Sequence, residues 1–470
     1  MSLSIQDNTS VYRLLNTMQQ LEVQRSMTLA RLSTGLRINR ASDNPAGLIA
    51  VKMLESELSS VHAALDNNQR TQSMLSVASG ALAEVSSLLA DIQQLSLASI
   101  GDTLSVSEKA ANQAQVDSAI ASIDRILGGT TFNGRNIFGG ANQIAATLSM
   151  ADAADLKDVR IYSCNPGQAN TVLTVNVTAA ATKATTAGTS IANVTSALTA
   201  DTVLTVAGKD GTATITIASG STLDQMISML NQSTGVTGVS ASKSGTELVM
   251  TSIDYGSEAF VSVAALSGDA SLVGTAQTGK LTGDDATVTV NGQNARTSGT
   301  EIYYNGNGIS FTANLADNTT GTRTITVVGG GATFQLGTDA STRSTIGLNG
   351  MNSFSLGRAD LGYLSSLKSG GAASLTTDPQ QAVTIVRKAI TQVATESARL
   401  GGFIKYEVGS SINNLGVQQE NLSSAVGMIR DADMAQEIVK LERINLLTQT
   451  TMALLSLVNN DKKTLVSLLR

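Results

Sequence analysis

The feature that most constrains this chain is a pair of helical heptad patterns at its two ends, separated by a middle with a different period. Near the N-terminus, apolar residues recur on alternating three- and four-residue steps, with Arg25 and Thr28 at the intervening positions. This spacing is typical of a coiled coil, in which one face of a helix is covered by another helix. The stripe comprises Val11, Leu14, Met18, Leu21 and Leu32.

A second, longer helix is predicted to begin at Pro45 and to end near residues 99–101. Asn44 is a preferred N-cap residue, and proline suits the first helical position. Its apolar stripe shifts register by about one residue across residues 67–69, which we interpret as a stammer, a local overwinding of a coiled coil. The seam positions predicted along this helix include Leu54, Leu58, Leu82 and Leu89.

A further helix is predicted over residues 107–127, followed by a tight turn. Asn133-Gly134 lies within TTFNGRNIF, and Asn-Gly is the strongest short signal for a two-residue hairpin. The long N-terminal helices are therefore expected to end in a small β-hairpin.

The C-terminal end repeats the helical pattern. Heptad spacing runs from about residue 378 to 430, and a last helix is predicted over residues 434–460. Neither end has a globular core of its own, so we expect the two ends to pair as antiparallel helices. The predicted seam residues here include Ile404, Leu415, Leu422, Ile429, Leu447 and Leu454.

The middle of the chain is rich in Thr, Ser, Gly, Ala and Val and alternates with a period of two. Residues 202–218 read as a hairpin, and residues 223–230 as a short amphipathic helix. The fold class expected is thus a mainly α rod of long antiparallel coiled-coil helices from both termini, carrying one or two inserted β-rich (α+β) outer domains. The expected segments are 1–44, 45–165, 166–370, 371–430 and 431–470, the third being the β-rich insert.

Composition excludes several function classes. The chain has a single histidine, His62, and a single cysteine, Cys164, so His-paired metal sites and an internal disulfide are ruled out. A net charge of −6 argues against nucleic acid as a partner. We also expect no secretory signal peptide and no membrane span.

No residue pattern supports catalysis or a cofactor. Asp431, Asp433 and Glu437 lack calcium-loop spacing, and helix capping with dipole matching explains them better than a metal site. His62 is expected to be a surface or packed residue, and Cys164 a small buried one. Two classes remain: a protein that completes its fold by self-assembly, and a binding module such as an adhesin, whose middle domain would carry the activity.

Several motifs resemble those of bacterial flagellin. LSTGLRINRASDNPAGL at residues 32–48 and ALDNNQRTQSMLSVASGALAEV at residues 64–85 resemble the family's N-terminal block. INNLGVQQENLSSAVGMIRDADMAQEI at residues 412–438 and the final VSLLR resemble its C-terminal block. Part of the middle, beginning at ITIASGSTLDQM, resembles an insert found in many flagellins and hook-associated proteins.

The resemblance implies a filament subunit that is exported through the flagellum's own channel and polymerises outside the cell at the filament tip. The terminal helices would form an inner coiled coil and the insert would face outward. Implied partners are further copies of the chain, the export apparatus, an export chaperone on the C-terminal segment, the filament cap and the hook-associated proteins. The nearest alternative within this group is the hook–filament junction protein.

Many flagellins also activate a Toll-like receptor that docks on the long N-terminal helix and the helix after it. The family pattern has Arg at the position aligned with Asp91 and Glu at the position aligned with Gln115, whereas Leu95 matches. The resemblance therefore implies that this chain is a weak receptor ligand.

Overall fold

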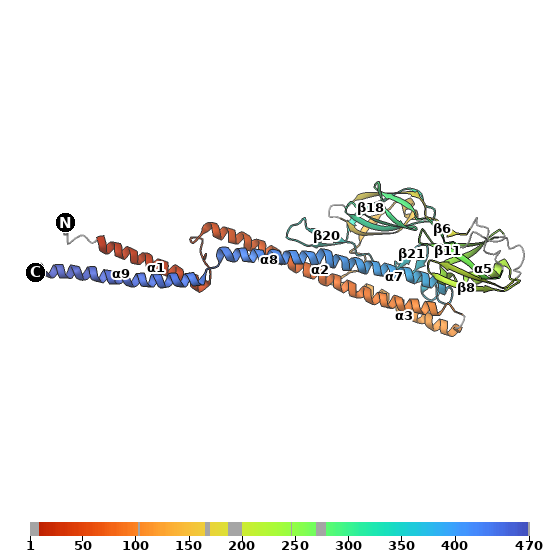
Figure 1. Ribbon diagram of the computed structural model, residues 1–470, viewed down its shortest axis with the longest axis horizontal. Helices are drawn as coiled ribbons and strands as arrows, with labels where there is room; N and C mark the ends of the chain where they lie inside the picture. The colour runs from red at the N-terminus through yellow and green to blue at the C-terminus, as the bar shows by residue number, and fades with distance from the viewer. Residues whose placement is uncertain are drawn as a thin grey trace. The chain divides into compact units, whose positions relative to one another are not determined.

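The computed structural model describes residues 9–101, 104–164, 170–186, 200–245, 247–268 and 279–468. The chain forms two compact units. The first contains Met1–Asn67, Gly337–Asp339 and Ser410–Arg470, and the second contains Asn68–Leu336 and Ala340–Gly409. The expected fold class is confirmed: the two ends of the chain are helical, and the β-rich insert lies between them in sequence (Figure 1).

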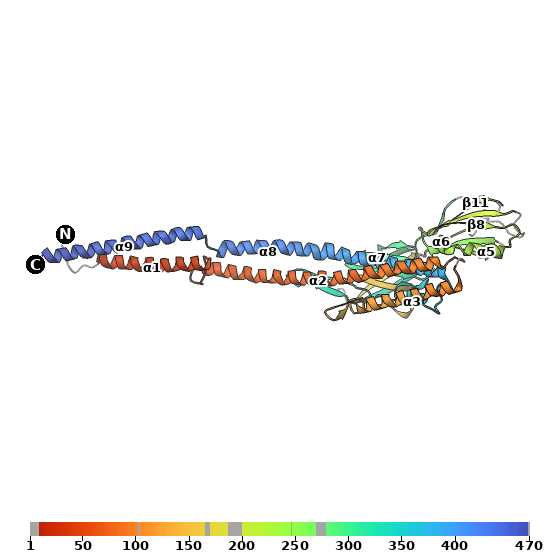
Figure 2. The ribbon, with the colours of Figure 1, turned by 90° about the horizontal axis from the view of Figure 1, so that it is seen from below.

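The first unit is built from helices that come from opposite ends of the chain. α1 (Thr9–Thr34) lies beside α9 (Met434–Leu468), as both views show (Figures 1 and 2). The start of α2 (Pro45–Ala98) packs against α8 (Gly409–Arg430) through Val61, Ala64 and Leu415. Arg31 near the end of α1 pairs with Glu437 near the start of α9, so these two helices are antiparallel as predicted.

α2 is one uninterrupted helix whose buried face changes register once. Its buried or half-buried positions alternate between three- and four-residue steps, except at one point. There, a three-residue step ends at Val61, and a second three-residue step leads to Ala64 before a four-residue step to Asn68. This break is the predicted stammer, placed a few residues earlier than expected. Between the two apolar stripes, the buried positions of this face are occupied by the polar residues Asn68 and Thr71.

The helices of the second unit include α3 (Val106–Gly129), which starts at the capping box Ser105–Glu108. The predicted hairpin after it is present, with β1 (Thr131–Phe132) and β2 (Arg135–Asn136) joined by Asn133 and Gly134 at φ values of 51° and 75°. Positive φ at both turn residues is what a type I′ turn requires. The C-terminal helix α7 (Pro379–Gly402) continues through a π-helical segment η3 (Phe403–Val408) into α8.

The larger β structure of this unit is a sheet whose two ends meet, and we call it the barrel. The stretch of residues 293–299 pairs with β13 on one side and with β16 on the other, which closes the sheet on itself. Its interior is one apolar core. In pairing order its strands are β14 (Gln293–Asn294), β13 (Thr287–Val290), β5 (Thr171–Ala179), β18 (Gly321–Gly330), β3 (Ile144–Thr147), β4 (Leu156–Cys164), β17 (Ile309–Leu315), β16 (Glu301–Gly306) and β15 (Arg296–Ser298), with β19 (Ala332–Gln335) and β20 (Arg343–Ile346) beside β4.

A smaller α+β structure is inserted between β5 and β13, and we call residues 183–282 the small module. The predicted hairpin and amphipathic helix are both present, as β7–β8 and α5. A separate apolar core holds it together. Its elements are β6 (Lys183–Thr185), β7 (Thr202–Gly208), β8 (Gly211–Ile217), α5 (Leu223–Asn231), α6 (Thr234–Thr237), β9 (Val239–Ser244), β10 (Glu247–Tyr255), β11 (Phe260–Ser267) and β12 (Leu281–Thr282).

The β-rich region begins earlier than the sequence predicted. β3, the short helix α4 (Met150–Asp155) and β4 fall within the stretch of residues 45–165 that was expected to be helical rod with a hairpin. β4 pairs with β17, a partner about 150 positions away, so local pattern gave no sign of it. Before α7 the chain forms β21 (Gly357–Arg358), β22 (Gly362–Tyr363) and the 3₁₀ turn η2 (Leu364–Leu367).

Candidate functional site

The α1–α9 pair forms a heptad seam that we call the terminal seam. All seven predicted N-terminal positions face it: Leu21 and Thr28 are buried, and Val11, Leu14, Met18, Arg25 and Leu32 are half-buried. On α9 the seam consists of Glu437, Leu441, Ile444, Thr448, Thr451, Leu455 and Val458. Buried Glu437 is neutralised by Lys440 at 2.6 Å and Arg31 at 3.6 Å.

Leu447 and Leu454 do not lie on the terminal seam, contrary to the sequence-based prediction. Their side chains are 42% and 51% exposed, and each lies one position from a seam residue. The stretch TQTTMALLSLV has apolar residues on several helical faces, so its period did not define one register. Contact with α1 selects the face that contains Thr448 and Thr451 instead.

The terminal helices expose large apolar side chains outside that seam. Contiguous exposed apolar surface on a soluble chain typically marks an interaction site. On α1 these residues are Tyr12, Leu15, Val23, Met27 and Leu29, and on α9 they are Met434, Ile438, Val439, Leu446, Leu447, Met452, Leu454 and Leu457.

The segment between α1 and α2 binds the end of α8. The Arg37 guanidinium donates to the carbonyl oxygens of Met428 at 3.0 Å and Ile429 at 2.6 Å, which otherwise have no partner within the helix. The backbone N–H of Arg37 donates to Arg430 O, and Ala432 N donates to Gly35 O. Sequence reasoning missed this role of Arg37, because its partners are nearly 400 positions away.

The turn before α2 is held by side-chain caps. The Asp43 carboxylate accepts backbone N–H groups of Arg40 and Asn39, and these hydrogen bonds hold its pKa below the ordinary value. Asn44 caps α2 through Gly47 N at 2.9 Å, as predicted. A side chain at Gly47 would meet Asn44 and Ile38 at 2.8 Å, which explains the glycine in DNPAG.

The other predicted seam residues lie on buried or half-buried helix faces. In the first unit Leu415 is buried, whereas Leu54, Leu58, Leu422 and Ile429 are half-buried. In the second unit Leu82 and Leu89 are fully buried, and Ile404 is half-buried within η3. The π-helical turn adds a residue between Leu400 and Val408, so both of these stay buried where the sequence has Gly401-Gly402.

The residues aligned with receptor contacts are accessible. Asp91 on α2 and Gln115 on α3 are exposed, and Leu95 is half-buried. Substitutions at Asp91 and Gln115 therefore leave the core of the second unit untouched.

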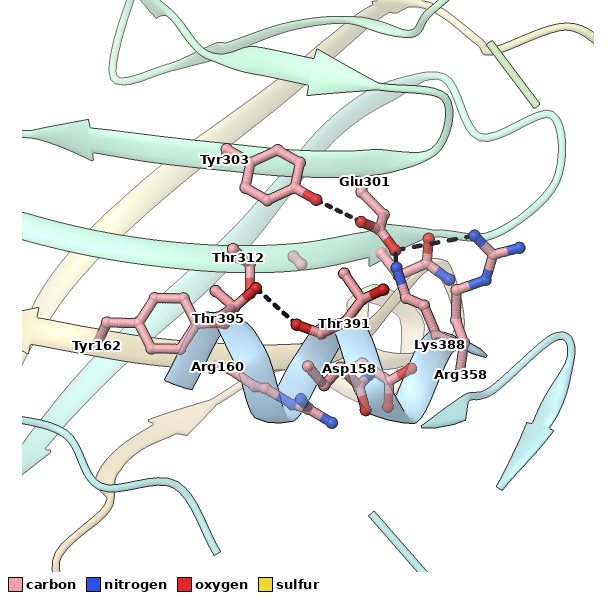
Figure 3. A pocket seen from close by; sticks show the side chains of 13 residues that line it. Asp158, Arg160, Tyr162, Glu301, Tyr303, Thr312, Arg358, Lys388, Thr391 and Thr395 are labelled. Carbon is pink, nitrogen blue, oxygen red and sulfur yellow. Dashed lines mark hydrogen bonds and ion pairs between the residues drawn. The ribbon is translucent and has the colours of Figure 1, made fainter. Parts of the chain in front are cut away.

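A polar cavity lies beside α7 in the second unit. Figure 3 shows Glu301 on β16 facing Lys388 on α7 and Arg358 on β21. Burial lowers the pKa of Lys388 to about 8, reinforced by Lys209 and Arg160 and opposed by Asp254 and Asp158. Tyr303 donates to the same carboxylate at 2.5 Å, so the charged groups of this cavity largely pair with one another.

One carboxyl group of α7 is almost fully buried. Glu396 is paired with Arg399 at 2.6 Å, and burial nevertheless raises its pKa. The Arg399 guanidinium lies 3.8 Å from the centre of the Tyr162 ring and donates to Tyr162 O and Gly347 O. No local pattern predicted this buried pair.

The remaining candidates have structural roles. His62 is exposed, and Cys164 is buried, which raises the pKa of its thiol. Asp433 caps α9 by accepting Ala435 N and Gln436 N. Among the described residues, no group of three or more His, Cys, Asp or Glu side chains is placed to hold a metal ion.

One described helix, α2, is long and apolar enough to cross a membrane by length and composition. Core helices of water-soluble proteins meet the same criterion, and the most buried apolar residues of α2 lie along one face. The absence of a membrane span therefore stays a prediction.

Comparison with known proteins gives matches along most of the chain. Residues 5–143 match the bacterial flagellin N-terminal helical region, and residues 383–469 match the bacterial flagellin C-terminal helical region. Residues 203–254, which lie in the small module, match the flagellin hook IN motif.

Individual relatives along the chain are also described as flagellins. The chain is 27% identical to a flagellin of Clostridium tyrobutyricum over 93% of each chain. It is 32% identical to a putative flagellin of Bacillus subtilis over 30% of this chain and 82% of that relative. Among solved structures it is similar to a flagellar hook-associated protein 3 of Legionella pneumophila, with 11% identity, a TM-score of 0.28, and 84% of this chain and 99% of that chain covered.

Proposed function

This chain belongs to the bacterial flagellin family, and from that premise we propose that its terminal helices join successive subunits of the flagellar filament. It is a structural subunit of that extracellular filament, since both terminal regions of the family are present in order. The relatives that match nearly its whole length are flagellins, which favours this function over that of the hook–filament junction protein.

The observation that carries the proposal is the apolar surface of α1 and α9 that remains after the two helices have paired. Val23 and Met27 on α1, and Ile438, Leu446 and Leu454 on α9, are between 47% and 61% exposed. If this surface packs against a different surface of the next copy, with a rotation that does not close into a ring, the contact builds an open helical filament. Electron microscopy of the purified chain under polymerising salt should show filaments; persistent monomers would contradict the proposal.

We propose no catalytic role for the cavity beside α7. A carboxyl with a raised pKa, Asp210, does line a neighbouring part of it, but Asp210 pairs with Arg387 at 3.0 Å. Its charged groups therefore serve as structural ion pairs rather than as a free acid and base.

Limited proteolysis should distinguish the monomer from the filament. We expect residues 1–40 and 432–470 to be cleaved in the monomer and protected in the filament. The terminal seam of one chain buries few large apolar side chains, Leu21 and Ile444 among them, so it offsets little of the entropy lost on ordering two long helices. Equal protection of these termini in the monomer would show that the seam orders them alone.

A deletion tests whether the insert is needed for assembly. Removal of residues 170–360, which lie within the insert expected from the sequence, would take β17 away from β4 and β18 away from β3. Residues 143–347 are the better deletion, because Leu348 N donates to Asn142 O at 2.9 Å and the two cut ends already lie together. A shortened chain with a glycine bridge should still polymerise, since the terminal helices are unchanged; a folded variant without filaments would refute this.

The family also suggests how the chain reaches the filament. We propose that it passes through the flagellar export apparatus in an unfolded state, with an export chaperone on its C-terminal segment. We further propose that the filament cap and the hook-associated proteins are its partners at the filament ends. The exposed apolar residues of α9 are suited to bind a chaperone before polymerisation covers them.

We propose that the chain is a weak Toll-like receptor ligand. The support is the replacement of a basic position by Asp91 and of an acidic position by Gln115, both at exposed sites on neighbouring helices of the family's receptor surface.

A further inference from the structure

The small module and the barrel have separate apolar cores. One core lies inside the barrel and the other lies between the sheets and α5 of the small module. The chain crosses between them twice, side by side: Thr182 N donates to Asp284 O at 2.9 Å, and Asp284 N donates to Thr182 Oγ1 at 2.8 Å. Tyr255 of the small module packs on the barrel core, and among the described residues the two apolar cores have no member in common.

Apart from Tyr255, the contacts that can orient the small module against the barrel are polar. Structures joined by a small polar interface are expected to move relative to one another unless other contacts hold them. At the crossing, Asp285 accepts Ser257 N at 3.0 Å and Gly299 N at 2.7 Å. A second set of polar contacts lies farther away, on α7.

Adjacent residues of α7 reach the two β structures separately. Arg387 pairs with Asp210, in the β7–β8 turn of the small module, at 3.0 Å. The next residue, Lys388, pairs with Glu301 on β16 of the barrel (Figure 3). Consecutive side chains on a helix point about 100° apart. These two neighbouring residues can therefore contact different structures, one the small module and the other the barrel.

Arg358, on β21, connects the same two structures. Its guanidinium pairs most closely with Asp360 at 2.5 Å, and it also lies 3.8 Å from Glu301 of the barrel and 3.6 Å from Asp254, at the end of β10 in the small module. Asp254 in turn pairs with Lys209 at 3.4 Å. The basic residues of α7 and β21 thus each face a carboxylate on one or both β structures. The basic residues are Arg358, Arg387 and Lys388, and the carboxylates are Asp210, Asp254 and Glu301.

We propose that these six residues form an ionic latch that sets the orientation of the small module against α7 and the barrel. The latch acts on placement rather than on folding, since the small module has its own core. Gln380 adds a contact beside it by donating to Gln232 O at 2.5 Å, where Gly235 allows α6 to approach α7 closely.

The electrostatics suit a latch that can open. Burial raises the pKa of Asp210 despite the charge of Arg387, so partial desolvation offsets much of the attraction in this pair. Removing one partner of such a pair is costly because it leaves the other charge without compensation, whereas replacing both in compensating fashion is not. Comparing each single charge reversal with the double variant, in which the two charges are exchanged, therefore separates the effect of the Arg387–Asp210 pair from the effect of the residues around it.

Hydrogen exchange of the full-length monomer tests the latch. Arg387→Asp and Asp210→Arg should each raise amide exchange about tenfold at residues 232–238 and 208–212, which lie against α7. Core amides of β7 and β11 should exchange as before, because the fold of the small module is retained. The swapped double variant should return the exchange of both segments to that of the parent chain.

Lys243→Asp is the matched control, because Lys243 pairs with Asp224 at 3.4 Å inside the small module and away from α7. It should leave residues 232–238 unchanged. Unchanged exchange in both reversals, or a swap as fast as the single variants, would overturn the latch. Faster exchange throughout β7 and β11 would also count against it, since the pair would then stabilise the fold of the module rather than its placement.

Discussion

Leu82→Asp and Leu415→Asp are each expected to abolish filament formation. The Leu82 side chain is fully buried in the second unit, and Leu415 is 4% exposed between α2 and α8 in the first. An aspartate at either position would be buried without a partner, at a cost of several kcal/mol. That is a large part of the roughly 5–15 kcal/mol by which a domain is stable. Electron microscopy and sedimentation under polymerising salt measure the loss.

Matched variants separate a folding defect from an assembly defect. Val77→Asp on α2 and Val417→Asp on α8 introduce the same carboxylate at positions that are 44% and 58% exposed. Thermal unfolding of these controls should stay within about 0.5 kcal/mol of the parent chain, whereas both seam variants should unfold at clearly lower temperature. Normal filaments from Leu82→Asp or Leu415→Asp would show that these buried faces of α2 and α8 are not needed for assembly.

Receptor activation by the monomer is expected to be weak, and the effect should be large. An interface charge that loses its partner costs about 2–5 kcal/mol, which corresponds to roughly one and a half to three and a half decades of affinity. Asp91 reverses the charge of the aligned family position and Gln115 removes another. A reporter titration with purified monomer should therefore need far higher concentrations than a strong agonist.

Back-substitution gives the sharper experiment. Asp91→Arg combined with Gln115→Glu should raise the response, and because both positions are exposed, the variant should unfold like the parent chain. Glu84→Arg is the matched control, since it makes the same change of charge at another exposed position of α2. Strong activation by the unmodified monomer, or equal gains from Glu84→Arg, would contradict the assignment.

Much of the helical part of the fold could be predicted because its signals are local. Asn44 and Pro45 defined the start of α2, Asn133-Gly134 defined the hairpin, and heptad spacing placed Leu21, Leu82 and Leu415 on buried faces. These features depend on residues within one or two helical turns of each other. The motifs that indicate the family lie in the same segments.

The contacts between distant segments could not be predicted from the sequence. Leu447 and Leu454 were placed on the seam because the last helix is apolar on several faces, and only contact with α1 selects Thr448 and Thr451 instead. β4 joins the barrel through β17, Arg37 caps α8, and Arg387 meets Asp210 across long intervals of chain. Periodicity tells which residues of a helix or strand share a face, but which partner covers that face depends on the packing of the whole chain, so only the tertiary structure decides it.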